Sequence, residues 1–547
     1  MVKALPPRPR GIELAAAGLV LLLAWLVVYP IGIVALDAAN GTALRAFVTR
    51  GGEWAALWAS VWISLASVVL AGAIGIPLAF LFEWFDFPGR KTLGALIALP
   101  VVLPPLVGVI AFLFLYGESG FIARTLQVVL HLEQAPWRLQ GPAAILLVHA
   151  YSMYVYFYLF TRAGLARLDV SMLEAAQALG ADRRATFWRV IVPLLRPSLV
   201  GAAILTFMTA LGSFSAPYIF GGGFRVMTTQ IVATKLNGDL PLAMVETVAL
   251  AVVAIVGLLI LRRTEGEDIL VALGKGIAPR PRPIRRPGVR MLATALGWGL
   301  AVVLLLPHLT LLLVSLVPYG AWTTEIVPPV LNFENYRRLF SEAERLRPMI
   351  NSLWMAAAST AVAVAIALAG GWLVVRKRVA VRQVIEGLLA LPWALPGTVF
   401  AIALAITFSI TAPLQLRFLL VGTAVILPLA YLVRALPLTG RGILASYRQL
   451  DPALEEAAAS LGAGRWRTFT RVTIPQLRPG LAAGASLAFV AALGDIVASI
   501  VLYTYETRPV SIEILSSLRL SETGVAAAFG VVLMLVSALV LGIGARR

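Results

Sequence analysis

Two polar segments with nearly the same sequence hold the residues best suited to binding a partner. They run from Asp169 to Leu199 and from Asp451 to Leu481, and 17 of their 31 aligned positions are identical. Asp169 or Ser171 in the first copy and Asp451 in the second can cap a helix, and a glycine follows where that helix can end in a left-handed conformation. The sequence therefore predicts short helices near 170–180 and 452–462. Because the rest of the chain is very apolar, two such surfaces indicate two docking sites.

Each predicted helix carries small side chains beside one acidic residue. Alanine adds little bulk, so a groove of another protein can approach closely, and the carboxylate can accept hydrogen bonds from the partner's basic or N–H groups. The candidate docking residues are Glu174, Ala175, Ala176 and Gly180 in the first copy, and Glu456, Ala457, Ala458 and Gly462 in the second.

Residues typical of catalysis or metal binding are few. The chain has no cysteine, and its three histidines follow no metal-ligand spacing. No G-x-x-x-x-G-K-[ST] phosphate-binding loop occurs, so we do not expect this chain to hydrolyse ATP by itself. We interpret the histidines as surface or helix-packing residues: His131, His149 and His308.

The composition is that of an integral membrane protein. Of the 547 residues, 60% are hydrophobic and only 13% are charged. A helix needs about 20 mainly apolar residues to cross a bilayer, and long apolar runs exclude the short alternating segments of a barrel. We expect an all-α fold with about 12 transmembrane helices, near 12–36, 57–83, 92–116, 142–165, 198–221, 241–262, 291–317, 350–375, 384–411, 417–437, 480–502 and 523–545.

The repeat extends beyond the polar segments. Residues 59–62 match 351–354, and 98–104 match 390–396, so we predict two parallel six-helix repeats. Parallel repeats around an axis along the membrane normal create a path at their interface. The predicted divisions are a first unit at 1–261, a basic proline-rich linker at 262–290 and a second unit at 291–547. We interpret the linker as cytoplasmic and close to anionic lipid, with a regulatory or partner-binding role as the alternative.

The net charge of +18 does not indicate nucleic-acid binding. With both termini placed in the cytoplasm, 31 Lys and Arg residues fall in cytoplasmic segments and 13 in external ones. This asymmetry follows the positive-inside rule for membrane proteins.

Five residues are candidates for a translocation path. Pro104 and Pro396 lie inside predicted spans, where proline frees carbonyl groups that either line a cavity or accompany a packing kink. Ser213, Ser215 and Asp495 lie at matching places in the fifth and eleventh spans. An intramembrane acid is a functional candidate, although Asp495 can equally be a structural partner of Arg434 or lie near the external surface. We interpret Arg434 as a snorkelling residue near a helix end.

The two polar segments resemble the signature of the membrane permeases of type I ABC importers. That signature is Glu-Ala-Ala, three residues, Gly, nine residues, then two apolar positions one residue apart and Pro. The first copy continues from Gly180 to Val190, Val192 and Pro193, and the second from Gly462 to Val472, Ile474 and Pro475. Valine replaces the more usual isoleucine at the first apolar position.

The resemblance implies a permease fold whose two short helices are coupling helices. It also implies two copies of a cytoplasmic ABC ATPase, which bind ATP and Mg, an external substrate-binding protein and a position in a bacterial inner membrane. No cofactor is implied for this chain.

The fused two-unit arrangement is similar to the iron(III) branch of these permeases, so ferric iron is the expected cargo, with metal-contacting residues unknown. Thiamine, aminoethylphosphonate, polyamine and sulfate remain alternatives. An ion-coupled secondary transporter is the alternative from another class, and it predicts paired intramembrane charges. Only Asp495 and Arg434 offer such a pair.

Overall fold

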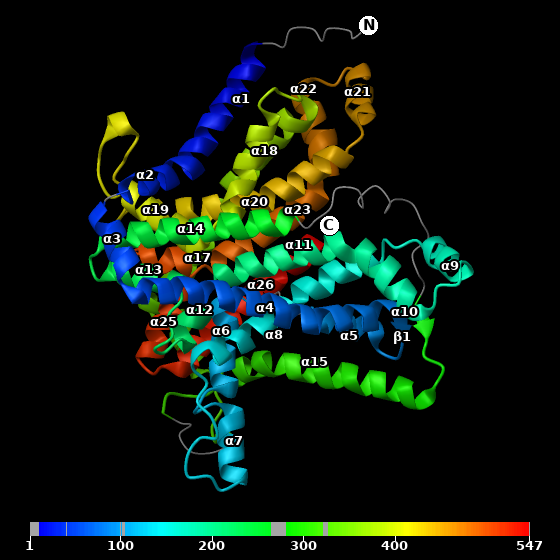
Figure 1. Cartoon of the computed structure of the whole chain (residues 1–547). Helices are drawn as coiled ribbons and strands as arrows, with labels where there is room; N and C mark the ends of the chain where they lie inside the picture. The colour runs from blue at the N-terminus through cyan, green and yellow to red at the C-terminus, as the bar shows by residue number, and fades with distance from the viewer. Residues whose placement is uncertain are drawn as a thin grey trace. The chain divides into compact units, whose positions relative to one another are not determined.

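The fold is helical throughout the described part of the chain. The computed structural model describes residues 10–39, 41–98, 100, 104–263, 281–320 and 327–545. These form long helices joined by short turns (Figure 1), as expected where lipid cannot satisfy exposed backbone groups. The only strands among these residues, β1 (Phe85–Asp86) and β2 (Arg282–Pro283), are two residues long and pair in parallel. The predicted all-α class is confirmed.

The described residues contain ten helices long and apolar enough to cross a membrane, or eleven if one bent pair counts as a span. The bent pair, Arg382–Ala394 and Gly397–Thr407, turns by 105°. The predicted span at 417–437 corresponds to α20 (Ile426–Gln449), which is absent from the ten. The ten are Gly11–Asp37, Gly51–Trp84, Pro105–Val129, Gly141–Leu165, Arg183–Leu211, Leu240–Arg263, Pro287–Ser315, Ala343–Arg376, Arg465–Leu493 and Thr523–Gly544.

The third span lies later in the chain than the predicted window at 92–116. The first part of the predicted window is the short helix α5 (Arg90–Ile97). The span itself begins at Pro105 and runs to Val129 as α6 (Pro105–Tyr116) and α7 (Phe121–Val129). Proline is favoured at the start of a helix, where its missing N–H has no partner to lose. The segment between the predicted spans at 92–116 and 142–165 therefore contains a helix.

One compact unit comprises residues 47–233 and 249–332. Its long helices pack side by side, and α11 contacts both α4 and α8. The remaining members of this unit are shorter or pack at its edge, as α15 does against α5 and α6. Besides α5, α6 and α7, its helices are α4 (Gly51–Trp84), α8 (Gly141–Leu165), α9 (Val170–Ala178), α10 (Arg183–Thr186), α11 (Val192–Leu211), α12 (Ser215–Phe220) and α15 (Pro287–Ser315).

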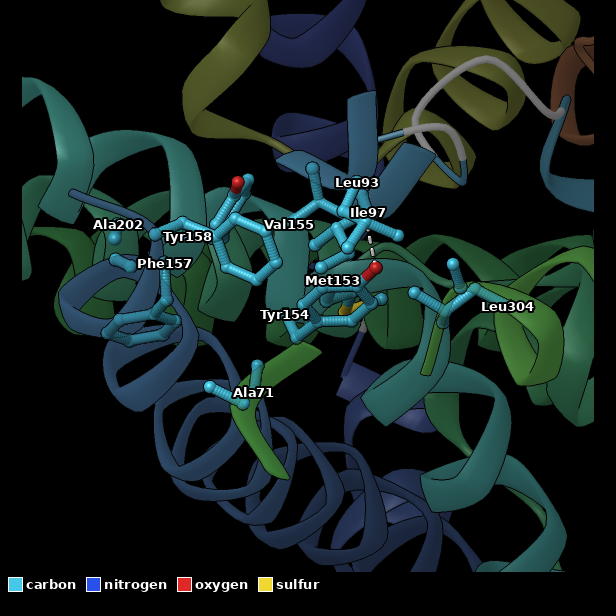
Figure 2. Packing of buried hydrophobic residues seen from close by; sticks show 14 of the residues in the cluster. Ala71, Leu93, Ile97, Met153, Tyr154, Val155, Phe157, Tyr158, Ala202 and Leu304 are labelled. Atoms are coloured by element: carbon cyan, nitrogen blue, oxygen red, sulfur yellow. Dashed lines mark hydrogen bonds between the residues drawn. The ribbon is translucent and has the colours of Figure 1, made fainter. Parts of the chain in front are cut away.

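Small residues and tyrosines hold this unit together. A side chain on Gly75 of α4 would collide with the carbonyl of Tyr154 on α8, so the two helices pack very closely, as small residues allow in membranes. Figure 2 shows Tyr154 among Leu93, Ile97 and other buried apolar residues, with its hydroxyl donating to the Ile97 carbonyl. The core thus satisfies the polar end of the tyrosine.

The other compact unit comprises residues 1–46, 234–248 and 333–547. In it α20 packs against both α17 and α23, while α1 contacts α18 and α2 contacts α19. Its helices are α1 (Arg10–Leu23), α2 (Tyr29–Asp37), α16 (Glu334–Ser341), α17 (Ala343–Gly371), α18 (Arg382–Ala390), α19 (Gly397–Thr407), α20, α21 (Pro452–Ser460), α22 (Arg465–Thr468), α23 (Ile474–Leu493), α24 (Val497–Leu502), α25 (Val510–Arg519) and α26 (Thr523–Ala545).

Three helices continue across the unit boundaries, and shorter helical turns join the main helices. Each of the π-helical turns occupies five residues. The boundary helices are α3 (Gly41–Thr49), α13 (Met227–Leu236) and α14 (Leu240–Arg263); the π turns are Ala24–Val28, Phe187–Ile191, Trp372–Arg376 and Phe469–Thr473, and the 3₁₀ turns are Leu391–Ala394 and Pro413–Gln415.

These units group the helices differently from the predicted divisions at 1–261 and 291–547. The predicted boundaries follow the sequence repeat, whereas each compact unit draws its helices from both halves of the sequence. Most of the predicted linker, residues 264–280, lies outside the described residues.

The same hydrogen bonds recur in both copies of the repeat. Ser60 accepts from the Met227 backbone N–H at 2.7 Å, and Ser352 accepts from the Val510 N–H at 2.8 Å. Likewise, Thr228 donates to the Ser213 carbonyl and Ser511 to the Asp495 carbonyl, at 2.7 and 2.8 Å. The sequence repeat is therefore also a repeat of local structure.

Candidate functional site

The first predicted docking helix forms as α9. Asp169 caps it, because its carboxylate accepts from the Ser171 N–H at 3.0 Å. Gly180 follows the helix with a φ of +85°, and the Ala181 N–H bonds back to the Ala176 carbonyl at 3.0 Å. A side chain at this left-handed position would be strained, which explains the glycine.

The second predicted docking helix forms as α21. Asp451 accepts from the Ala453 N–H at 2.9 Å, Pro452 occupies the first turn, and Gly462 has a φ of +80°. Figure 1 shows α21 as a short helix beside α22, which it contacts. The two helices lie where the sequence predicts them, and their docking role stays a prediction.

Both short helices present most of their surface outward. Glu174 and Ala175 are exposed and Ala176 is half-buried in α9, whereas Glu456 and Ala457 are exposed and Ala458 is buried in α21. Two further residues stand out, because Leu179 and Leu461 are each 89% exposed. The sequence reasoning missed these leucines, although a leucine before the glycine in both copies was a visible signal.

The two helices are anchored by different chemistry. In the first copy Leu173 packs against the buried cluster that contains Ile191. At the equivalent positions of the second copy, Thr473 donates to Glu455 at 2.7 Å, and the same carboxylate lies 3.1 Å from Arg376 Nε. An apolar contact has thus been replaced by a polar one, and Glu455 is a positioning residue that the sequence analysis did not single out.

Ser213, one of the predicted pathway residues, is bonded to a buried histidine. His149 is 1% exposed and lies between Ser67, at 2.8 Å from Nδ1, and Ser213, at 2.9 Å from Nε2. The Ser67 hydroxyl donates to the Ile63 carbonyl at 2.6 Å, so it accepts from His149 Nδ1–H, and Ser213 donates to Nε2. Of the two predicted roles for the histidines, surface or helix packing, His149 has the helix-packing role. Ser215, another predicted pathway residue, is buried at the start of α12.

Asp495 forms an ion pair with Arg434. The carboxylate is 2% exposed and also accepts from the N–H of Ala498, in the first turn of α24, at 2.7 Å. The Arg434 side chain is 39% exposed. The structural partnership considered for these two residues is present, whereas the interpretation of Arg434 as a helix-end residue is wrong, because α20 continues to Gln449.

Pro104 and Pro396 break the apolar runs in the same way. Pro104 precedes α6 with φ −54° and ψ 138°, and Pro396 precedes α19 with φ −55° and ψ 145°. Both are buried. These prolines begin new helices instead of kinking continuous ones, and whether they line a path stays a prediction.

One fully buried acid inside a predicted span escaped the sequence analysis. Glu246 is fully buried in α14, where Thr234 donates to its carboxylate at 2.9 Å. Its position within the predicted span at 241–262 was the available signal. The described residues contain no group of three or more His, Asp or Glu side chains placed to hold a metal ion.

Comparisons with known proteins match both halves of the chain. The family model "Binding-protein-dependent transport system inner membrane component" matches residues 71–264 and 348–546. The "Probable ABC transporter permease protein y4fN" of Sinorhizobium fredii is 30% identical over 84% of this chain and 81% of its own length.

Two relatives are named for different metals. The "Ferric transport system permease protein FbpB" of Actinobacillus pleuropneumoniae is 28% identical over 80% of this chain, which spans 63% of that protein. The "Molybdenum transport system permease protein ModB" of Mycobacterium tuberculosis is 32% identical over 34% of this chain and 69% of its own length.

Proposed function

The chain belongs to the family of binding-protein-dependent transport system inner membrane components and is the permease of an ABC importer, and we propose that it carries ferric iron across the inner membrane. The observation that supports this cargo is the relative named for ferric transport, which aligns over 80% of this chain and therefore over both copies of the repeat. Membership in this family replaces the alternative of an ion-coupled secondary transporter.

In this proposal α9 and α21 are the coupling helices. Each sits in a groove of one cytoplasmic ATPase subunit, and two copies of the ATPase bind and hydrolyse ATP with Mg. The exposed residues Leu179 and Leu461 would enter those grooves, because burying an exposed leucine on binding is favourable by about 1.5–3 kcal/mol. Both chain termini are then cytoplasmic, and an external binding protein delivers the cargo on the opposite side.

An oxyanion is the second candidate cargo. The relative named for molybdenum transport matches one third of the chain, and sulfate is among the alternatives that the sequence leaves open. Thiamine, aminoethylphosphonate and polyamine remain alternative cargoes. For each of them the proposed role of this chain as the permease is the same.

Uptake by the assembled transporter tests the proposal. We would reconstitute this chain with its ATPase and binding protein in liposomes and measure ATP-dependent uptake of radioactive iron added as ferric citrate. We expect uptake that requires both partners, with radioactive molybdate not accumulated. Uptake of molybdate without iron would reassign the cargo, and transport without any ATPase would contradict the proposed mechanism.

A further inference from the structure

The helix α20 has one exposed stripe, and it is basic. Between Ile426 and Tyr447 its residues are buried or half-buried except for Arg434, Arg441 and Ala445. Arg448 follows seven residues after Arg441 and is also exposed. Residues seven apart lie on nearly the same side of an α-helix, two turns from each other. Three arginines therefore follow one face of a helix whose other faces are packed.

This stripe extends far along the helix. Arg434 and Arg448 are 14 positions apart, which corresponds to about 21 Å of helix, compared with a hydrocarbon core of about 30 Å. Arg448 lies close to α21 and can reach the membrane surface, but Arg434 cannot reach the same surface by snorkelling. Charged residues at such depth face protein or a water-filled cavity in membrane proteins. A water-filled cavity along the exposed side of α20 would meet this requirement for the whole stripe.

Neighbouring groups hold the three side chains on this face. The buried Asp495 forms an ion pair with Arg434, and the carboxylate of Glu386 lies 2.7 Å from the Arg448 guanidinium. The Arg441 guanidinium stacks over the Trp393 ring, 3.9 Å from its centroid. A guanidinium has five N–H donors, so the carboxylate contact at Arg434 or Arg448 leaves donors for a further anion. At Arg434 the exposed charge is positive, because its carboxylate partner is 2% exposed.

The first copy of the repeat lacks this stripe. At the offset of 282 residues that aligns the polar segments, Ser152, Leu159 and Ala166 occupy the three positions. The structure supports this register, because Gly164 lies against Ser198 in the first copy and Ser446 lies against Gly480 in the second. The basic stripe is thus a property of the second copy alone and does not follow from the fold that the copies share.

We propose that Arg434, Arg441 and Arg448 line the cargo path and select a cargo with a net negative charge carried on oxygen atoms. The proposal rests on the function proposed above and specifies the chemical class of its cargo. Iron would then pass as an anionic complex with an oxygen-rich organic acid and not as the bare cation. A free oxyanion carries the same chemistry, and the experiment below distinguishes the two.

Arginine labelling tests water access and anion binding without transport. The complete transporter in nanodiscs would be treated with phenylglyoxal, and the labelled peptides quantified by mass spectrometry. We expect labelling at Arg441, and more slowly at Arg434, with protection by ferric citrate or molybdate but not by thiamine or by choline chloride of equal ionic strength. Unlabelled Arg434 and Arg441 would place the face in lipid, and labelling without selective protection by an anion would also overturn the proposal.

Uptake by variants then measures the contribution of the charge. Arg441→Gln should lower ATP-driven uptake of the cargo roughly tenfold, as a field focused in a cleft allows, whereas Arg441→Lys should retain most of it. The pair Arg434→Gln with Asp495→Asn removes both charges without leaving a buried carboxylate unpaired, and it should lower uptake similarly. Arg290→Gln, which removes a cation at the start of α15, is the matched control.

The outcomes separate this inference from the function on which it rests. Normal uptake by both arginine variants, or transport of a cationic cargo, would overturn the anion path and leave the importer intact. Absence of ATP-driven uptake by the unmodified transporter would instead contradict the proposed function. Protection by ferric citrate alone identifies the iron complex, and protection by molybdate alone identifies the free oxyanion.

Discussion

At the scale of single residues, buried polar side chains determine how the apolar helices meet. His149 joins Ser67 on α4 to Ser213 beyond the end of α11 through two hydrogen bonds, and all three come from distant parts of the sequence. A buried hydroxyl that loses its partner costs free energy, although in membranes the average loss per hydrogen bond is modest. This histidine therefore positions Ser213 without itself needing to contact cargo.

Replacing His149 should destabilise the protein measurably. We expect His149→Leu to lower the free energy of unfolding by about 1–2 kcal/mol, because Ser67 loses a donor and Ser213 loses an acceptor. His149→Gln, which can bond to both, should cost less. Thermal unfolding in detergent measures the effect, with Met153→Leu in the same helix as the apolar control. Equal stability of the Leu and Gln variants would show that the hydrogen bonds contribute little.

Two glutamates outside the membrane spans, Glu522 and Glu513, give stability a pH dependence. Glu522 accepts from Arg345 at 2.8 Å and from Arg338 at 3.0 Å. Burial raises the pKa of Glu522, but hydrogen bonds and charges from the two arginines outweigh it and hold that pKa below the ordinary value of 4.5. Burial raises the pKa of nearby Glu513 despite Arg508 and Arg345, so that group has the opposite effect.

The sign of the Glu522 contribution follows from its lowered pKa. The stabilisation is fully present above the unfolded pKa near 4.5 and is lost as pH falls through the lower folded value. Glu522→Gln should therefore reduce the melting temperature at pH 7 and flatten its decline between about pH 5 and pH 3. Glu334→Gln, which removes an exposed ion pair with Arg337, is the control. An unchanged pH profile in Glu522→Gln would contradict this role.

At the scale of elements, the short helices α9 and α21 depend on glycines at their ends. Gly462→Asp should strain the left-handed turn by about 1–2 kcal/mol and place a negative charge at the negative end of the helix. We expect cargo-stimulated ATPase activity to fall severalfold while membrane insertion is unchanged, and the same for Gly180→Asp. The matched control is Gly464→Asp, because Gly464 has a φ of −65° and is also open to solvent. Unaltered activity in both variants would count against a coupling role.

The elements that the sequence predicts well are those determined by local chemistry. The caps at Asp169 and Asp451 and the glycines at 180 and 462 locate α9 and α21 within a few residues. The span at 92–116 was misplaced because a proline pair starts a new helix at Pro105. Its hydrophobicity was visible, but its proline was interpreted as lining a cavity or kinking a continuous span, and not as preceding a new helix.

Long-range polar contacts could not be predicted in the same way. The bonds of His149 and the pairing of Glu455 with Arg376 join residues 64 to 82 positions apart, and no local pattern specifies them. Asp495 with Arg434 was considered only as one alternative, since their 61-residue separation carries no periodic signal. The arginine stripe was hidden by a predicted helix end at 437, which separated Arg434 from Arg441 and Arg448.

At the scale of the whole molecule, the two halves of the sequence do not fold as two separate bodies. The compact unit that holds most of the second half also includes α1 and α2, which contact α18 and α19, and α15 from the second half packs against α5 and α6. Each half therefore supplies a helix that covers apolar surface belonging to the other. When the covering helix is absent, the helix faces that it packs against lose the van der Waals contacts that stabilise helix association in lipid.

Splitting the chain tests this interdependence. We expect residues 1–263 and 264–547, expressed separately, to be degraded or to aggregate on extraction, whereas co-expression should give a complex with a melting temperature near that of the intact chain. Removing residues 1–38 from the first fragment should prevent rescue, because α18 and α19 then lose the helices that contact them. Removing residues 1–9 alone is the control and should have no effect. Size-exclusion chromatography monitored by fluorescence measures all four cases, and a stable, monodisperse fragment 264–547 on its own would show that the helices contributed by the first half are dispensable.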